Sequence, residues 1–426
     1  MQKVDFELDA PVLLPEQFTS HKVRGMYLLI VGERPTWIVL NQAEYEAFKE
    51  LVGGATVREV LKSHPQETVS HLLAKVHQAK FYREDTSVRR TYPPKLTLYI
   101  SNRCNLKCVH CYAAAGDALP SELTTPEWLE VIDQYSQIAQ SGEVTISGGE
   151  PTLHPELGVL LESVANHGHR SVLFTNGTTG GGKLGWNTLG QTVDVIQLSI
   201  DGFDEDTNDE IRGKGTFRKV LQTYETLYDT RTQIRLSVCA MPQNVDSLRN
   251  GLLQFLRKYD PAKKIGLILS PTVVAGRNEN GTYAFDYPEL QEAIGDSLDE
   301  IWRSGWRFPN TFQRNDHQPR CGIGSSILIA PDGGYRACTF APISGNVRQQ
   351  RLADWYSTTQ ERLEHFNVDN IEMCKDCDLR HICLGGCVVK MGHRARCTSS
   401  GPCTPANRNF YYEKLVRESM VLFGER

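Results

Sequence analysis

The middle of the chain carries six short apolar segments, and stretches with helical periodicity separate them. Short apolar runs of this kind are typical of buried parallel strands. They span residues 95–100, 143–147, 171–175, 195–200, 233–238 and 265–269. Strands that alternate with helices predict right-handed crossovers and a parallel sheet. We therefore expect an α/β core built as a partial (β/α)6 barrel that is open on one side.

The connection after the first strand shows the helical pattern well. Thr125 is a candidate N-cap, and Pro126 fits the first helical position. Apolar side chains then recur at the spacing of one helix face. They are Trp128, Leu129, Ile132, Tyr135 and Ile138. The pattern predicts a helix that packs one face on the sheet.

The residues on either side of the barrel predict two further domains. Over residues 1–90 we expect a winged-helix-like domain, with a hairpin at 25–31 and 36–40 followed by three helical stretches. These stretches span 42–51, 56–63 and 68–79. The barrel takes residues 91–310. Residues 311–426 form the last domain, with a hairpin turn at 331–335 and a helix at 407–422 that we expect to pack this domain against the barrel.

Composition and charge limit the classes of partner that we expect this chain to bind. The chain has 46 basic and 51 acidic residues, for a net charge of -5. The first ninety residues carry no concentrated basic stripe, so we expect no nucleic-acid partner. Neither a membrane-spanning segment nor a secretion signal is visible, and twelve cysteines without such a signal predict a reducing, cytoplasmic location.

Three cysteines follow the first predicted strand within eight residues: Cys104, Cys108 and Cys111. A four-iron cluster normally takes four thiolates, so a cluster held by these three has one iron open to a substrate or cofactor. A zinc site with His110 as fourth ligand is the alternative. A disulfide is less favoured in a reducing compartment.

Other polar and glycine-containing segments also end strands, where ligands gather in parallel sheets. They are Gly148–Pro151 after the second strand, Asn176 after the third, and Ser199 and Asp201 after the fourth. The simpler alternative for Ser199 and Asp201 is that they cap the next helix.

Residues 311–426 carry eight more cysteines, enough for two fully ligated four-iron clusters. They are Cys321, Cys338, Cys374, Cys377, Cys383, Cys387, Cys397 and Cys403. A zinc ribbon is the alternative, because cysteines two residues apart are common in zinc sites.

The cysteine triplet, followed by Gly148-Gly149-Glu150-Pro151, resembles the radical S-adenosylmethionine (radical SAM) superfamily. The resemblance implies that the triplet holds a [4Fe-4S] cluster and that Tyr112 is the aromatic residue after it. It also implies that Gly148–Pro151 contact the methionine end of S-adenosylmethionine and that Ser199 and Arg212 bind its carboxylate or ribose. The implied cofactor-binding residues are Tyr112, Gly148, Gly149, Glu150, Pro151, Asn176, Ser199, Asp201, Arg212 and Gly276.

The C-terminal cysteines resemble the SPASM extension of peptide-modifying radical SAM enzymes. That resemblance assigns Cys321, Cys338 and Cys387 to an inner auxiliary [4Fe-4S] cluster. It assigns Cys374, Cys377, Cys383 and Cys403 to an outer one, giving three clusters in all. Cys397 either completes the inner cluster or leaves it with an open iron. The first ninety residues resemble the PqqD-like peptide-recognition element, to which an extended leader peptide adds as a strand.

Together these resemblances imply a peptide maturase. It would cleave S-adenosylmethionine to a 5'-deoxyadenosyl radical and cross-link a ribosomally made precursor peptide, with electrons from a flavodoxin- or ferredoxin-type donor. The alternatives are a formylglycine-forming oxidase acting on sulfatases, a peptide epimerase, and a non-catalytic iron-sulfur or zinc scaffold. Cys239 is the one cysteine outside the cluster sets, so it is either the hydrogen donor of an epimerase or a small buried side chain.

Overall fold

The structure of the chain is a computed structural model that describes residues 7–83, 94–306, 320–387 and 403–423. The chain divides into two compact units. The smaller unit contains Met1–Thr91, Thr311–Cys321 and Glu364–Arg426, and the larger contains Tyr92–Asn310 and Gly322–Leu363. The segment that the sequence assigns to one C-terminal domain therefore contributes to both units.

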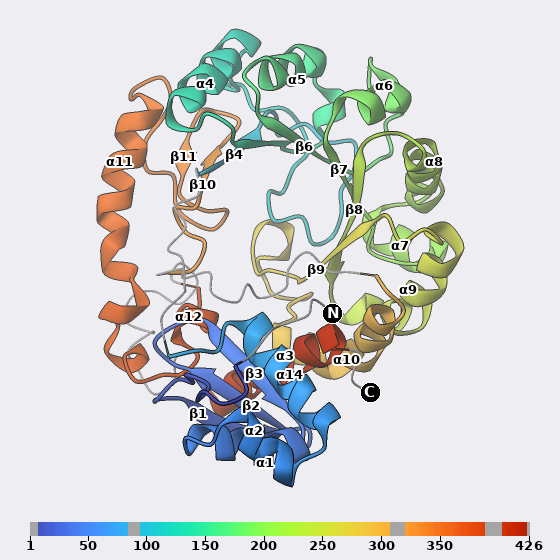
Figure 1. The fold of residues 1–426 in the computed structure, drawn as a ribbon. Coiled ribbons are helices and arrows are strands. Elements are labelled where there is room, and N and C mark those ends of the chain that lie inside the picture. Colours follow the sequence, from blue (N-terminus) through green and yellow to red (C-terminus); the bar gives the residue numbers. More distant parts are fainter. Residues whose placement is uncertain (1–6, 84–93, 307–319, 388–402, 424–426) are drawn as a thin grey trace. The chain divides into compact units, whose positions relative to one another are not determined.

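The larger unit is built on one curved eight-stranded sheet with the order β11-β10-β4-β5-β6-β7-β8-β9 (Figure 1). Neighbouring strands from β10 through β4 to β9 pair in parallel. The strands are β4 (Lys95–Tyr99), β5 (Glu143–Ser147), β6 (Arg170–Thr175), β7 (Val195–Ser199), β8 (Gln233–Ala240), β9 (Gly266–Pro271), β10 (Ser326–Ile329) and β11 (Tyr335–Arg336). The six predicted strands are present, and the hairpin β10–β11 widens the sheet beyond the expected six.

Helices cover the outer side of this sheet (Figure 1). They are α4 (Thr125–Ile138), α5 (Leu157–Asn166), α6 (Gly185–Thr192), α7 (Glu205–Arg212), α8 (Thr216–Tyr228), α9 (Val245–Tyr259), α10 (Tyr287–Arg303) and α11 (Leu352–Leu363). Short 3-10 turns lie at Pro151–Leu153, Pro242–Asn244 and Gly276–Asn278. The N-cap of α4 is Thr124, one residue before the predicted position.

The prediction that Ser199 and Asp201 could cap the helix after β7 is wrong. The N-cap of α7 is Asp204, whose side chain accepts a hydrogen bond from the backbone N–H of Thr207 at 2.8 Å. An aspartate there satisfies one of the orphan N–H groups of the first turn. Ser199 and Asp201 are thus left for other contacts.

The smaller unit contains a three-stranded antiparallel sheet of order β1-β2-β3. Its elements are β1 (Thr19–Val23), β2 (Met26–Val31), β3 (Thr36–Leu40), α1 (Gln42–Val52), α2 (Val57–Ser63), α3 (Gln66–Ala79), α12 (Arg380–Cys383) and α14 (Pro405–Phe423), with 3-10 turns at Glu364–Phe366, Val368–Asn370 and Glu372–Cys374. The hairpin β2–β3 and the three helices were predicted. The strand β1 was not, because its sequence is mostly polar and its residues are largely exposed.

Both faces of the small sheet are buried. One face packs against α1 to α3, with Leu29, Ile38 and Leu40 in one apolar cluster. The other face packs against the C-terminal segment. Its cluster contains Leu28, Ile30, Trp37, Val39, Leu379, Ile382, Tyr412, Leu415 and Val416. The helix α14 therefore covers the small sheet, and its expected packing of the last domain against the barrel stays a prediction.

A buried carboxylate joins β1 to the C-terminal segment. Asp378 accepts hydrogen bonds from Thr19 Oγ1 at 2.8 Å and from Tyr412 OH at 3.0 Å, and lies 2.5 Å from His21 Nε2. Arg408 Nη2 lies 3.2 Å away. Burial alone would raise the pKa of Asp378, but these partners outweigh it and bring the pKa down to about 2. The carboxylate is therefore charged and fixes β1 to the chain after Cys377.

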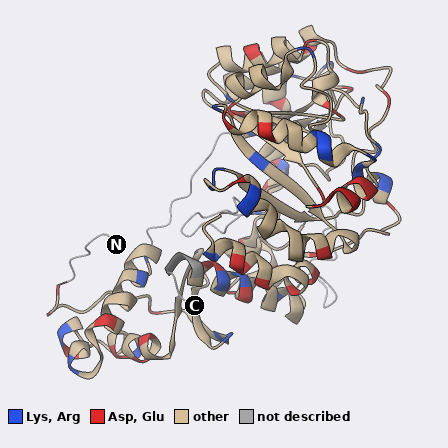
Figure 2. Cartoon of the chain, turned by 90° about the vertical axis from the view of Figure 1, so that its right-hand side faces the viewer, with Lys and Arg blue, Asp and Glu red and all other residues tan. Residues whose placement is uncertain are grey.

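Figure 2 shows Lys and Arg interspersed with Asp and Glu over the described helices of each unit. Such a mixed surface is typical of a solvated exterior. None of the helices that the structure describes combines the length and apolar character needed to cross a bilayer.

Candidate active site

One cavity of about 450 Å³ brings together most of the predicted site residues of the larger unit. It lies where the strands β4 to β9 end, as expected for a parallel sheet. Its lining includes Cys104, Cys108, Cys111, Tyr112, Gly148, Gly149, Asn176, Ser199, Arg212 and Cys239. The four other predicted cofactor-binding residues, Glu150, Pro151, Asp201 and Gly276, do not line it.

The loop that carries the three cysteines is held from one side by Arg277. Its Nε donates a hydrogen bond to the carbonyl oxygen of Cys108 at 2.8 Å, and its Nη1 donates to that of Ala115 at 2.8 Å. The backbone N–H of Arg277 donates to Cys111 O at 3.0 Å. The residues after β9 thus clamp the cysteine loop, a role that the sequence did not reveal.

Asparagine and threonine side chains hold the same loop from the end of β6. Asn176 Nδ2 donates to Asn105 Oδ1 at 3.0 Å, and Asn105 Nδ2 donates to Thr178 Oγ1 at 2.9 Å. Thr178 in turn donates back to Asn176. The position of the cysteines is therefore set by contacts from two loops rather than by the local sequence alone.

Three of the predicted glycines pack directly against the cysteine loop. A Cβ atom at Gly148 would lie 2.4 Å from Ser101 O, and one at Gly149 would lie 2.3 Å from Arg103 O. At Gly276 it would lie 2.3 Å from Cys111 O. Separations this short forbid any side chain. These glycines are needed for loop packing, in addition to the close approach to a cofactor that we expected of Gly148 and Gly149.

Glu150 lies behind the cavity wall and ties two loops together. Its side chain, in a residue that is 1% exposed, accepts hydrogen bonds from Thr175 Oγ1 at 2.7 Å and from Asn176 N at 2.8 Å. Thr152 donates to it through both its backbone N–H and its hydroxyl. Burial raises the pKa of Glu150. The carboxyl group of Glu150 therefore accepts four hydrogen bonds from other groups of the protein.

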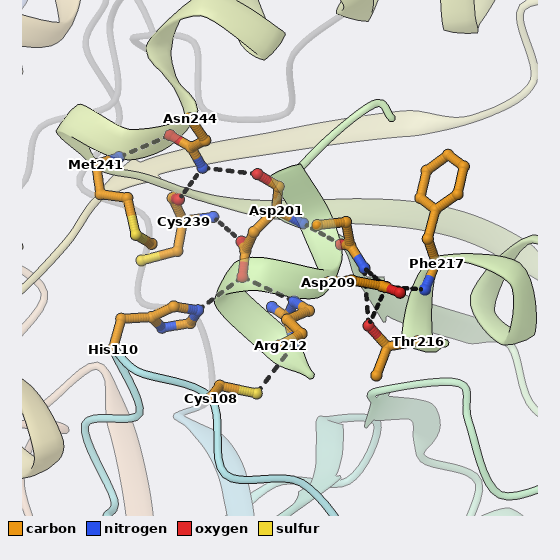
Figure 3. A network of polar contacts seen from close by, with 11 residues as sticks. Cys108, His110, Asp201, Asp209, Arg212, Thr216, Phe217, Cys239, Met241 and Asn244 are labelled. Atoms are coloured by element: carbon orange, nitrogen blue, oxygen red, sulfur yellow. Dashed lines mark hydrogen bonds and ion pairs between the residues drawn. The ribbon is translucent and has the colours of Figure 1, made fainter. Parts of the chain in front are cut away.

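Asp201 is the centre of a buried polar network at the cavity wall (Figure 3). Its Oδ2 lies 2.7 Å from Arg212 Nε and 2.6 Å from His110 Nε2, and its Oδ1 accepts the backbone N–H of Cys239 at 2.7 Å. Asn244 Nδ2 donates to the main-chain oxygens of both Asp201 and Cys239. Burial would raise the pKa of Asp201, but Arg212 and His110 outweigh it and lower the pKa to about 2.

The donor set around the cysteine sulfurs fits an iron-sulfur cluster. Arg212 Nη1 lies 4.0 Å from Cys108 Sγ, and Asn176 Nδ2 lies 4.0 Å from Cys104 Sγ. Burial raises the pKa of both thiols, so a metal centre that binds them displaces their protons. N–H groups directed at cluster sulfurs stabilise the reduced, more negative state.

The zinc alternative gains no support from this geometry. His110, its proposed fourth ligand, directs Nε2 to Asp201 instead. Within the described ranges, no three His, Cys, Asp or Glu side chains converge closely enough to hold a single metal ion.

Several predicted ligands of the outer auxiliary cluster lie together in the smaller unit. The thiols of Cys377, Cys383 and Cys403 are close enough to affect one another's ionisation, and burial raises the pKa of the first two. Cys374 is buried with Val368 and Ile371. These thiols belong to one unit, and their role as ligands of the outer cluster stays a prediction.

The predicted ligands of the inner auxiliary cluster are divided between the two units. Cys338 belongs to the larger unit, whereas Cys321 and Cys387 belong to the smaller one. Cys397 lies outside the described residues. The inner ligand set stays a prediction from the sequence.

Comparison with known proteins bears directly on this cavity. Residues 98–249, which carry the cysteine loop and the network of Asp201, match the family model of the radical SAM superfamily. The mycofactocin maturase MftC of Mycobacterium ulcerans is 32% identical over 318 residues, which is 70% of this chain and 83% of that protein. The AdoMet-dependent heme synthase of Methanosarcina barkeri is 28% identical over 331 residues, covering 70% of this chain and 92% of that protein.

Among solved structures, Streptococcus suis SuiB bound to S-adenosylmethionine has a similar fold. The TM-score is 0.58 with 18% identity, over 89% of this chain and 96% of that one. The similarity to MftC extends well past the segment matched by the family model. This relationship, and the match of that segment, show that the chain belongs to the radical SAM superfamily.

Proposed function

We propose that this radical SAM enzyme modifies a ribosomally made precursor peptide and joins two of its residues oxidatively, through a thioether or a carbon–carbon bond. The observation that carries the proposal is the single cavity shared by three cysteines and a glycine-rich loop, in a chain 32% identical to a maturase. The fold of SuiB bound to the precursor peptide SuiA supports it, with a TM-score of 0.57 over 89% of this chain.

The residues of the cavity fit the two groups that the family uses. Cys104, Cys108 and Cys111 would hold a [4Fe-4S] cluster, with Gly148, Gly149, Ser199 and Arg212 around S-adenosylmethionine. When bound, these groups supply a one-electron reduction and, through it, removal of a hydrogen atom from the substrate. A flavodoxin- or ferredoxin-type protein would deliver the electron.

The chain's own residues position these groups. Asp201 is fully buried and keeps Arg212 charged and directed toward Cys108. Glu150 holds the ends of β5 and β6 together, and Arg277 ties the cysteine loop to the residues after β9. A fixed loop favours reaction because the substrate then meets a preorganised site.

The smaller unit would guide the peptide. Its antiparallel sheet can accept an extended leader segment as a further strand, because backbone hydrogen bonds at a sheet edge require no particular side chain. The cysteines of residues 311–426 would hold the inner and outer auxiliary [4Fe-4S] clusters. An auxiliary cluster suits an oxidative cross-link because it can accept the electron that the substrate radical loses.

The test is anaerobic reconstitution followed by reaction with a co-expressed precursor peptide. We expect iron and sulfide in the protein, formation of 5'-deoxyadenosine, and loss of two hydrogens from the peptide for each link. A variant with Cys104, Cys108 and Cys111 replaced by Ala should lose both products. If the reconstituted protein forms no 5'-deoxyadenosine, or if peptide mass never changes, the proposal is wrong.

A peptide epimerase is the second candidate, because Cys239 lines the cavity. Burial raises the pKa of this thiol, so it stays protonated and retains a hydrogen to donate. An epimerase would incorporate one solvent deuterium in D₂O without a mass change in H₂O. We expect Cys239→Ala to leave the cross-linking yield within about twofold. Loss of product with Cys239→Ala but not with Ser237→Ala, a neighbouring residue of the same wall, would favour the epimerase.

A further inference from the structure

A second cavity of about 280 Å³ adjoins the first within the larger unit. Both cavities are lined by Tyr99, Tyr112, Gly148 and Thr339, so they meet beside the cysteine loop. The far wall of the second cavity comes from the hairpin β10–β11 and its flanks. It contains Ala330, Pro331, Asp332, Arg336 and Ile343.

The sheet register directs Arg336 toward the inside of the barrel. Arg336 pairs with Leu328 on β10, and Leu328 pairs with Thr97 on β4. Paired residues point to the same face of a sheet, and Leu328 and Thr97 both line the first cavity. The neighbouring Tyr335 points to the opposite face, where its ring stacks on Trp355 with centroids 4.8 Å apart. This packing fixes the direction of the Arg336 side chain.

Arg336 differs from the two arginines of the first cavity. Arg212 is paired with Asp201, and Arg277 donates to two main-chain carbonyls. Arg336 Nη1 donates to Ala341 O at 3.1 Å, and no carboxylate of the described residues lies within ion-pair distance of it. A guanidinium has five N–H donors, so this hydrogen bond leaves others available to a ligand in the cavity that Arg336 lines.

Asp332 lines the same cavity, but its hydrogen bonds lie within the hairpin turn. Its Oδ1 accepts the backbone N–H of Gly334 at 3.1 Å, and its main-chain oxygen accepts Asn346 Nδ2 at 3.0 Å. These bonds hold the turn of the hairpin. The side chain therefore stabilises the wall that presents Arg336 rather than neutralising its charge.

The remaining lining of the second cavity includes three partly exposed apolar or aromatic side chains. Tyr112 is 41% exposed, Leu119 is 40% exposed and Ile343 is 46% exposed. Side chains of this kind beside an unneutralised guanidinium match a ligand with a carboxylate next to an apolar group.

We propose that the second cavity binds a carboxylate of the substrate peptide through Arg336, with an apolar side chain of the same peptide against Leu119 and Ile343. The inference rests on the proposed function and names the chemistry that the site selects. An arginine fork can bind a carboxylate through two parallel hydrogen bonds. Because the two cavities share four lining residues, the carboxylate would lie close to the modified residue along the peptide.

The test uses N-acetyl-L-phenylalanine and its amide, titrated by NMR into the reconstituted full chain with S-adenosylmethionine present. The acid should bind at least about tenfold more tightly than the amide, which corresponds to about 1.4 kcal/mol. Arg336→Gln should remove this preference and Arg336→Lys should keep part of it. The control Arg218→Gln changes an exposed arginine paired with Glu205 and should leave binding unchanged.

A third probe identifies the source of the carboxylate. N-acetyl-aspartyl-phenylalaninamide carries only a side-chain carboxylate. If it binds like the acid, the site accepts an acidic side chain, and if it binds like the amide, the site is selective for a C-terminal carboxylate. Equal binding of acid and amide to the unmodified protein overturns the inference, as does an unchanged preference in Arg336→Gln. Formation of 5'-deoxyadenosine in the same samples tests the proposed function separately, because it requires no occupant of the second cavity.

Discussion

Replacing Asp201 with Asn should strongly destabilise the larger unit. The carboxylate is fully buried and holds two cationic or polar partners, Arg212 and His110, at 2.7 and 2.6 Å. Asn has nearly the same shape but no charge. The substitution therefore leaves the guanidinium of Arg212, in a residue that is 8% exposed, without a counter-charge.

The structure sets the size of the effect. The pKa of Asp201 falls from 3.8 to about 2, which corresponds to about 2 kcal/mol of preference for the carboxylate in the folded state. Because the folded-state pKa is lowered, this stabilisation is complete above pH 3.8 and is lost as the pH falls through 2. Leaving the partner charge buried and unpaired costs more, about 3–5 kcal/mol. We expect a loss of about 3 kcal/mol in the free energy of unfolding at pH 7.

The assay is urea unfolding followed by tryptophan fluorescence. Five of the six tryptophans belong to the larger unit, so the signal reports mainly on it. The matched control is Asp204→Asn, the exposed N-cap of α7, because Asn caps helices as well as Asp does. The control should change the unfolding free energy by less than about 0.5 kcal/mol.

A double variant separates charge from shape. Arg212→Met removes the orphaned charge, so Asp201→Asn with Arg212→Met should be more stable than Asp201→Asn alone. The reasoning is refuted if Asp201→Asn costs less than about 1 kcal/mol, or if adding Arg212→Met produces no recovery.

Two further substitutions test the loop packing and the smaller unit. Gly149→Ala should reduce iron incorporation at least severalfold because its Cβ would lie 2.3 Å from Arg103 O. The control Gly116→Ala has open space around its Cβ and should leave the iron content unchanged. Equal iron contents in the two variants would contradict this prediction. Asp378→Asn should accelerate hydrogen exchange of the β1 amides at pH 7, and in the unmodified protein the same protection should weaken as the pH falls from about 4 toward the pKa of about 2. Asp376→Asn, an exposed neighbour, is the control, and matching exchange rates in the two variants would count against a role for the buried carboxylate.

The sheet of the larger unit was predictable because burial leaves a direct signal in the sequence. The strand β7 is covered on both faces and carries the apolar residues Val195, Ile196 and Leu198, and its boundaries were predicted within one residue. The strand β1 was not predicted, because its sequence is polar and it lies at a sheet edge. Its strand state comes from pairing with β2, which its own pattern does not encode. The hairpin turn at 331–335 was predicted, but the pairing of β10 with β4 was not, because these strands lie far apart in the chain.

The candidate site was also predicted only in part. The rule that ligands gather at the ends of parallel strands brought Cys104 and Asn176 to the same cavity. The rule cannot tell a side chain that lines the cavity from one behind its wall. Asp201 and Glu150 were expected to contact the cofactor, yet both are buried and bonded to other protein groups. Arg277 was missed as a clamp because its partners lie more than 160 residues away in the chain.

The shared apolar cluster of β2, β3 and α14 constrains the order in which the molecule can be completed during synthesis. Trp37 and Val39 leave the ribosome long before Leu415 and Val416, which cover them. At ordinary translation rates of about 5–20 residues per second, that delay is roughly 20 to 75 s. Until then the nascent small sheet presents an uncovered hydrophobic face. A chaperone that shields this face during elongation, or slow refolding after release, should therefore determine the yield of intact protein.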